Sequence, residues 1–311
     1  MNTSLLRALW LGLAALPACA CAPDDFDPGS RVTSLRVLAV HADQPYAAPG
    51  ETVQLDTLSF DPQARPLSWA WAACVTPASS DVYPCFEKIA LDAAAGVPPL
   101  IGEDATGDSV SFTVPPDILE SLPEVARPAA LIGVVGITCP GSITFDAQAR
   151  PLPLHCNEAE SGRELSLEEY VVGIKRVFVR QTDKNQNPVI ERVTFDGEDW
   201  AEGDVKEVDA CSKDGNVYDD CKKVAHKVAA YITPDSFESG TDEYGRTFEE
   251  SLIVQQYSTE GIFEDEVRIG EEPETHWAAR LSAAGTEVTI WFVARDDRGG
   301  VSWATRRVRV R

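Results

Sequence analysis

The sequence contains none of the short motifs that commonly carry catalysis or nucleotide binding. H-E-x-x-H, G-x-S-x-G, G-x-G-x-x-G and a Gly-rich phosphate loop are all absent. The four histidines are far apart along the chain, which leaves little room for a catalytic base beside a nucleophile: His41, His155, His226 and His276. No C-x-x-C pair accompanies them, which argues against a zinc site. We therefore assign no catalytic residue and no cofactor.

Basic residues are scarce relative to acidic ones. The 311 residues include 27 Lys and Arg against 50 Asp and Glu, a formal net charge of −23. Nucleic-acid binding depends on clustered Lys and Arg that displace counterions from phosphates, so this balance argues against a nucleic-acid partner. The apolar fraction of 44% is still large enough for a sizeable core, and the length fits one large or two modest domains.

The N-terminal leader has no apolar run that reaches the roughly 20 residues needed to span a bilayer. Residues 1–21 carry one basic residue, Arg7, then the apolar residues 8–16 and a small-residue sequence that ends in Cys19-Ala20-Cys21. This order resembles the signal peptide of a bacterial lipoprotein. The resemblance implies export, cleavage and attachment to a membrane through a lipid on a cysteine.

Either of two cysteines could carry that lipid. Leu16 and Ala18 occupy the lipobox positions upstream of Cys19, although Pro17 departs from the usual pattern. Lipidation of Cys21 would instead leave six cysteines, an even number, in the mature chain. We favour Cys19 and keep Cys21, or an ordinary signal peptide cleaved nearby, as alternatives. Neither cysteine is followed by Asp, so resemblance to lipoprotein sorting signals implies the outer membrane if the cell is Gram-negative.

The remaining six cysteines fall into three close pairs: Cys74 and Cys85, Cys139 and Cys156, Cys211 and Cys221. Several connectivities are possible in principle, but an exported chain favours disulfides and the spacing favours neighbours. Each such bond would close a short loop and contribute on the order of 3 kcal/mol in the chain-entropy model.

Alternating and apolar segments predict an all-β chain with few helical periods. The expected strands lie at residues 35–40, 51–56, 67–74, 109–114, 129–139, 168–180, 189–195, 227–233, 252–257, 286–295 and 301–310. Residues 117–121 could form one helical turn. Residues 140–162 are expected to be a long loop clipped by a disulfide.

Two segments resemble parts of immunoglobulin-like domains. Residues 32–74 follow the opening order of such domains in bacterial surface proteins: a strand, a Pro-Gly-Glu turn, a Thr-Val-x-Leu strand, an Asp-Pro turn and a strand that carries Trp69 and Trp71. The inter-sheet cysteine of antibody domains is missing from residues 51–58. The resemblance implies a β-sandwich, and we interpret the Trp residues as core residues rather than as a platform for a sugar.

The C-terminal segment, residues 286–310, resembles the closing hairpin of an immunoglobulin-like or PKD-like domain. Val308 and Val310 stand in the opposite phase to Trp303, which predicts a β-bulge near Arg306.

Together these patterns predict two tandem immunoglobulin-like β-sandwich domains after a cleaved lipoprotein signal peptide. Residues 1–21 would be the signal, 22–31 a flexible tether, 32–183 the first sandwich and 184–311 the second. We place the boundary in the polar segment 182–188.

One acidic loop is a candidate for calcium binding. Residues 209–221 faintly resemble the Asp-rich loops of calcium modules, with possible ligands at Asp209, Asp214, Asn216 and Asp219. However, Cys211 and Lys213 interrupt the D-x-D-x-D spacing. We therefore prefer a turn closed by a disulfide, with no metal.

These observations favour a non-enzymatic, lipid-anchored binding or scaffolding protein of the cell envelope. Its partner would be an unknown envelope protein or glycan, bound through loops or exposed strand edges. The alternative is an envelope hydrolase acting on glycans or peptides, with carboxylates from the acidic clusters at 249–250, 264–266 or 271–272. Solvated surface explains such clusters better, but a carboxylate pair with a raised pKa in a cleft would favour the hydrolase.

Overall fold

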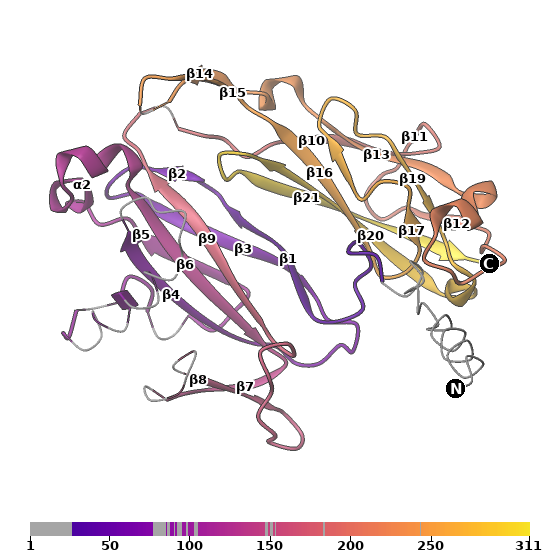
Figure 1. Cartoon of the computed structure of the whole chain (residues 1–311), viewed down its shortest axis with the longest axis horizontal. Coiled ribbons are helices and arrows are strands. Elements are labelled where there is room, and N and C mark those ends of the chain that lie inside the picture. The colour runs from indigo at the N-terminus through magenta and orange to yellow at the C-terminus, as the bar shows by residue number, and fades with distance from the viewer. Residues whose placement is uncertain are drawn as a thin grey trace, which may run out of the picture.

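The computed structural model describes residues 27–76, 85, 88–89, 91, 95–97, 99–102, 105–146, 149, 152, 154–182, 184–242 and 244–311. Within them the chain forms two β-sandwiches, one from each half of the sequence. The sandwiches lie next to each other along the longest axis of the molecule (Figure 1).

In the first sandwich a three-stranded sheet faces a four-stranded sheet. The smaller sheet has the order β1 (Arg36–Ala42), β3 (Thr52–Phe60), β5 (Ser109–Thr113), and the larger has the order β2 (Tyr46–Ala47), β9 (Val171–Val179), β6 (Leu131–Cys139), β4 (Ser68–Thr76). Val53 and Leu55 of β3 are buried against Val134 of β6, as expected for alternate residues of facing strands. A short helix α2 (Ile118–Ser121) and a 3-10 helix η2 (Glu124–Ala129) lead from β5 to β6.

The second sandwich consists of two five-stranded sheets. One has the order β11 (Glu198–Asp199), β10 (Ile190–Phe195), β13 (His226–Ile232), β19 (Thr275–Ala278), β17 (Ile262–Phe263), and the other β12 (Val205–Val208), β21 (Val301–Val310), β20 (Glu287–Asp296), β16 (Leu252–Ser258), β18 (Val267–Ile269). Between them lies a core that contains the fully buried rings of Trp277 and Phe292. A small hairpin, β14 (Ser239–Thr241) and β15 (Thr247–Glu249), precedes β16, and short helical turns occur at α3 (Tyr218–Cys221), η3 (Lys222–Val224), η4 (Pro234–Ser236) and η5 (Leu281–Ala283).

Both halves share one topological feature. A short early strand pairs in parallel with the last strand of its half, β2 with β9 and β12 with β21, whereas the neighbours of those last strands pair with them in antiparallel fashion. In the second half, the sheets β10-β13-β19-β17 and β21-β20-β16 correspond to the ABED and GFC sheets of an immunoglobulin domain. The expected all-β fold of immunoglobulin-like sandwiches is therefore confirmed.

The strands expected from the sequence are present, with ends that differ by a few residues, and α2 supplies the helical turn. The prediction of a long loop at residues 140–162 is wrong in one respect. It contains the hairpin β7 (Gly141–Phe145) and β8 (Leu154–Glu158). The disulfide between Cys139 and Cys156 and the burial of Leu154 hold this hairpin against the larger sheet, and neither contact is visible in the local alternation.

The β-bulge predicted near Arg306 is also wrong. Strands β20 and β21 pair in continuous register from Glu287↔Arg309 to Arg295↔Val301. The phase of buried residues changes because β21 buries different faces at its two ends. Val308 and Val310 face the core of the second sandwich, whereas Val301 and Trp303 belong to a cluster shared with the first.

The segment expected to be a flexible tether is bound to the protein over its last residues. Residues 22–26 lie outside the described residues, but Ser30 and Arg31 are only 1% and 6% exposed. The backbone of Ser258, at the end of β16, donates to Ser30 O and accepts from Val32 N, both at 2.9 Å. The prediction is therefore wrong for residues 27–31, because a polar composition does not reveal pairing with a remote strand end.

An apolar cluster joins the two sandwiches. The first half contributes Val32, Leu38 and Ala39, and the second half contributes Tyr257, Trp291, Val293 and Val301. The ring of Phe60 lies 5.0 Å from that of Trp291, between ring centroids. Burial of these apolar side chains between the sandwiches favours a fixed arrangement of the two over free hinge motion.

Polar contacts surround that cluster. Asn187, in the segment between the sandwiches, donates from Nδ2 to Ala42 O at 2.8 Å and accepts at Oδ1 from Val301 N at 2.9 Å. Lys175 of β9 is 8% exposed and donates from Nζ to Gly299 O, in the β20–β21 turn, at 2.6 Å. Burial lowers the pKa of Lys175 to about 8, although the nearby Asp296 opposes that shift.

Candidate functional site

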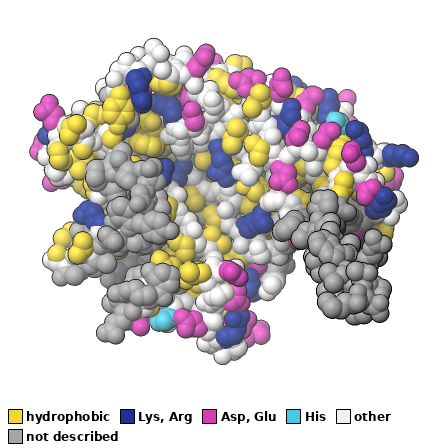
Figure 2. Space-filling model, viewed as in Figure 1, with side chains coloured by type: hydrophobic (Ala, Val, Ile, Leu, Met, Phe, Trp, Pro, Cys, Tyr) yellow, Lys and Arg dark blue, Asp and Glu magenta, His cyan; other side chains and the backbone are white. Residues whose placement is uncertain are grey.

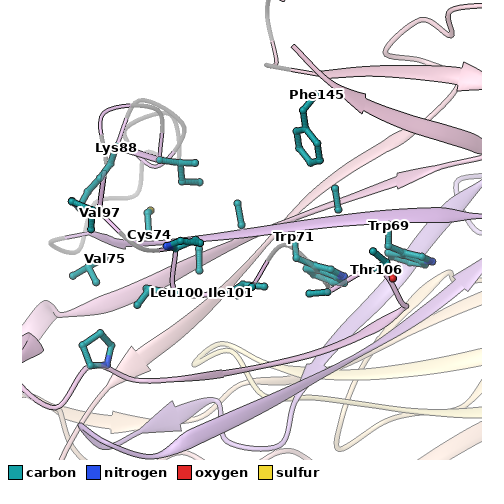
Figure 3. Close-up of a pocket in the computed structure, with 18 of the residues that line it drawn as sticks. Trp69, Trp71, Cys74, Val75, Lys88, Val97, Leu100, Ile101, Thr106 and Phe145 are labelled. Carbon is teal, nitrogen blue, oxygen red and sulfur yellow. The ribbon is translucent and has the colours of Figure 1, made fainter. Parts of the chain in front are cut away.

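A wide cavity surrounds β4, the strand at one edge of the four-stranded sheet of the first sandwich. Its volume is about 1740 Å³. β4 has β6 as its only strand neighbour among the residues that the structure describes. In Figure 3, Trp69 and Trp71 lie on one side of β4 and Phe145, from β7, lies on the other. Leu100 and Ile101 extend the apolar lining, and Lys88 supplies a cationic group.

The two Trp side chains are packed rather than displayed. Their rings are stacked with centroids 5.9 Å apart and an interplanar angle of 5°, and Trp69 is 8% exposed. Trp71 donates from Nε1 to Gly107 O at 2.8 Å and lies over Gly136, its partner on β6. A Cβ atom at Gly136 would come within 2.6 Å of the Trp71 ring, so this close approach requires glycine.

The sequence interpretation of these Trp residues as packing residues agrees with that geometry. Trp69 is buried and the Trp71 ring packs over Gly136, so neither ring presents a fully open face on which a sugar could stack. The cavity itself was not foreseen. Phe145 is 76% exposed at the end of β7, and only its place in an expected loop hinted at a surface role.

Disulfides hold the segments around β4 in place. The structure contains the three neighbour pairs expected from the spacing: Cys74–Cys85, Cys139–Cys156 and Cys211–Cys221. Cys74 lies on β4 opposite Gly133 of β6, and the first bond passes over that glycine. The second fixes β8 beneath the same sheet. The first bond therefore attaches Cys85 to the edge strand β4, and the second attaches β8 to the neighbouring strand β6, so both fix segments that line the cavity.

The acidic loop at 209–221 uses its polar groups for contacts within the protein. Asn216 accepts from Arg31 at 3.2 Å, Asp214 accepts from the backbone of Ser282, and Asp220 pairs with Lys213 at 2.6 Å. The other two candidate ligands, Asp209 and Asp219, are exposed. Over the described ranges, no group of three or more His, Cys, Asp or Glu side chains could hold a metal ion.

One member of the acidic clusters has a perturbed pKa. Glu250 is 6% exposed, and burial, reinforced by Asp296 and Glu238, raises its pKa to about 7. Its Oε1 accepts from Arg298 Nη1 at 3.2 Å. The Arg298 guanidinium lies 4.9 Å from the Tyr46 ring centroid of the first sandwich. Glu250 therefore takes part in the contact between the sandwiches, and it does not line the cavity around β4.

The two candidate lipidation sites, Cys19 and Cys21, lie outside the described residues. None of the helices in the described part of the chain has the length and apolar composition needed to cross a bilayer.

Comparisons with known proteins give only distant similarities. No family model matches the chain, and no curated protein sequence matches it. Among solved structures, a chimeric titin Z1Z2 functionalized with a KLER exogenous peptide from decorin is 10% identical, covers 89% of this chain and 98% of its own, and gives a TM-score of 0.21. The Yersinia pseudotuberculosis adhesin InvE is 8% identical, covers 87% of this chain and 58% of its own, and also gives 0.21. At these values the likeness carries no argument, so the fold assignment rests on the strand order.

Proposed function

We propose that this chain is a lipid-anchored, exported protein of the cell envelope that binds a partner protein without catalysing a reaction. The observation that carries the proposal is the apolar cavity around the edge strand β4, whose lining includes Trp71 and the exposed Phe145. An edge strand offers unpaired backbone groups, and side-chain pockets on its two faces can select alternate residues of an added strand. The partner would therefore present an extended, largely apolar segment.

Two features support a protein partner over a glycan. Trp69 is buried, and apolar side chains clearly outnumber polar ones among the described residues that line the cavity. On the face shown in Figure 2, hydrophobic side chains gather over the first sandwich, at the left, whereas Asp and Glu side chains are spread among Lys and Arg over the second, at the right. Such an exposed apolar area is typical of a protein-binding surface.

The proposed location rests on the leader. The apolar run, the small-residue sequence and Cys19 or Cys21 support lipidation, and the absence of Asp after either cysteine supports the outer membrane. Radiolabelled fatty acid should enter the wild-type protein, and a Cys19→Ser, Cys21→Ser double variant should lose the label. Unchanged labelling of that variant would contradict the lipid anchor, and the two single variants identify the cysteine that is used.

The binding role is tested with the exported part, residues 22–311, in a screen against envelope proteins and glycans. Phe145→Ser is chosen because a side chain that is 76% exposed can be changed without loss of the core. It should weaken capture of an envelope protein about tenfold or more, the loss expected for a central aromatic anchor. The matched control is Tyr244→Ser, an aromatic residue that is 55% exposed on the second sandwich.

Equal capture by wild type and Phe145→Ser would contradict the site. Capture of a glycan instead of a protein would contradict the partner. The hydrolase alternative predicts turnover of a glycan or peptide that is lost in Glu250→Gln; such turnover would overturn the non-enzymatic role.

A further inference from the structure

The residues that precede the first sandwich are bound to the second one. We call residues 27–32 the N-terminal staple. The Arg31 side chain is 7% exposed and pairs with Asp27 within the staple and with Glu260, at 3.6 Å between Nη1 and Oε1, in the second half. Its Nη1 also donates to Asn216 Oδ1, in the loop closed by Cys211–Cys221, at 3.2 Å.

The staple is held by further contacts of different kinds. Ser30 donates from Oγ to Glu266 Oε1 at 2.9 Å, and Ser258 forms the two backbone hydrogen bonds to the staple described above. Val32 is 1% exposed and packs in the apolar cluster between the sandwiches. A segment with backbone pairing, a buried guanidinium that keeps its acidic partners and a buried apolar side chain opens only at a substantial cost in free energy.

Little chain remains between the staple and the proposed lipid. Asp27 lies six positions after Cys21 and eight positions after Cys19. At about 3.3 Å per fully extended residue, they span at most about 20 to 26 Å. The lipid must therefore lie within that reach of the second sandwich.

The cavity around β4 lies at the opposite end of the molecule from Asn216 and Glu260, which the staple contacts. In Figure 1 the C-terminus, β12 and β17 occupy one end of the longest axis, and β4 and α2 occupy the other. The staple contacts the end that carries β12 and β17 through Asn216, two residues before α3 in the loop after β12, and through Glu260, two residues before β17. A tether that ran freely to residue 31 would let either sandwich approach the bilayer, and the staple removes that freedom.

We propose that the staple holds the second sandwich beside the lipid bilayer and that the first sandwich, with the cavity around β4, projects away from it. This inference rests on the proposed lipid anchor. Proximity comes from the short tether and not from adsorption, because a chain with a net charge of −23 is repelled by anionic lipid surfaces. A partner would therefore reach the cavity from the aqueous space.

The test compares two exposed valines as positions for a photo-crosslinking amino acid in the lipidated protein. Val217 follows Asn216 beside the staple and is 37% exposed, and Val125 lies on η2 of the first sandwich and is 86% exposed. Position 217 should crosslink to phospholipid at least about fivefold more than position 125, because its neighbour Asn216 contacts the staple, whereas position 125 belongs to the first sandwich. Equal crosslinking, or more from position 125, overturns the proposal.

Loss of the staple supplies a second readout. Arg31→Ala removes the ion pairs that the buried guanidinium forms with Asp27 and Glu260, lengthens the free tether and should bring the crosslinking ratio between the two positions toward one. The control is Arg192→Ala, which removes a surface ion pair with Asp199 and should leave the ratio unchanged. An unchanged ratio in Arg31→Ala would mean that the staple does not set the orientation.

A third arm separates failure of the orientation from failure of the lipid anchor. The chain from residue 22 is bound through an N-terminal His tag to vesicles that contain a nickel-chelating lipid, and the same two positions are compared. A high ratio of crosslinking at position 217 to crosslinking at position 125 on these vesicles, together with no fatty acid on the native protein, would overturn the lipid anchor and with it the proposed cellular orientation. Native lipidation with a ratio near one would overturn the orientation alone.

Discussion

The buried ammonium group of Lys175 makes a sharp prediction about stability and pH. Lys175 lies where β9 meets the β20–β21 turn, and burial lowers its pKa from 10.5 to about 8. A shift of this size corresponds to roughly 3 kcal/mol, at about 1.4 kcal/mol per pKa unit. That is the free energy by which burial disfavours the charged form of Lys175 in the folded protein near neutral pH.

The sign of the pH dependence follows from the protons bound in each state. Between about pH 8 and 10.5, the unfolded chain keeps the proton on Lys175, whereas the folded protein has lost it. Stability contributed by this group therefore rises with pH across that window, by about 3 kcal/mol in total. Most ion-paired lysines have the opposite effect, because a partner raises their pKa.

Lys175→Met removes both the buried charge and its hydrogen bond to Gly299 O, which costs about 1 to 3 kcal/mol when a buried carbonyl loses its donor. At pH 7 the variant should therefore be as stable as wild type or more stable by up to about 2 kcal/mol. Between pH 8 and 10.5 the unfolding free energy of the wild type should rise relative to that of the variant as the pH increases.

Urea unfolding of residues 22–311 at several pH values measures this difference directly. Lys223→Met, at an exposed position on η3, is the matched control and should follow the wild type at every pH. A difference between wild type and Lys175→Met that stays constant from pH 7 to 10 would refute the reasoning, because it would mean that the ammonium group titrates alike in both states.

Three further predictions concern the contact between the sandwiches. The folded protein keeps the proton on Glu250 up to about pH 7, so the contribution of this residue to the free energy of unfolding should fall as the pH rises from 4.5 to 7. Urea unfolding at pH 5 and 7.5 should show that Glu250→Gln removes on the order of 3 kcal/mol of this fall. Leu38→Ala, in the shared cluster, should lower the free energy of unfolding by about 2 to 5 kcal/mol and separate the calorimetric melt into two transitions. Val125→Ala, at an exposed site, should leave the melt unchanged, and a single unshifted transition in Leu38→Ala would contradict the shared cluster. Residues 32–183 and 184–311 should each give a β-rich circular dichroism spectrum alone, but each should melt below the full chain because half of the cluster is then exposed; equal melting temperatures would argue against that contribution.

Much of the fold could be predicted because the relevant information is local in the chain. Alternation places Val53 and Leu55 on the buried face of β3, and this pattern follows from the geometry of a strand whatever packs against it. The neighbour disulfides are likewise short-range, since closing a loop between Cys211 and Cys221 costs little chain entropy. The candidate site was only partly foreseen: Trp69 and Trp71 were recognised as packing residues, but the cavity beside them was not.

The sequence by itself therefore determined where the longer strands lie and which class of fold results, and it favoured the neighbour disulfides. Tertiary structure alone decided which face of a strand is buried at each end, as Trp303 and Val308 of β21 illustrate. It also decided that Arg31, Lys175 and Glu250 are buried, although their residue types are typical of a solvated surface. The physical reason is that burial at a contact depends on a segment far away in the chain, and no local period records which distant segment that is.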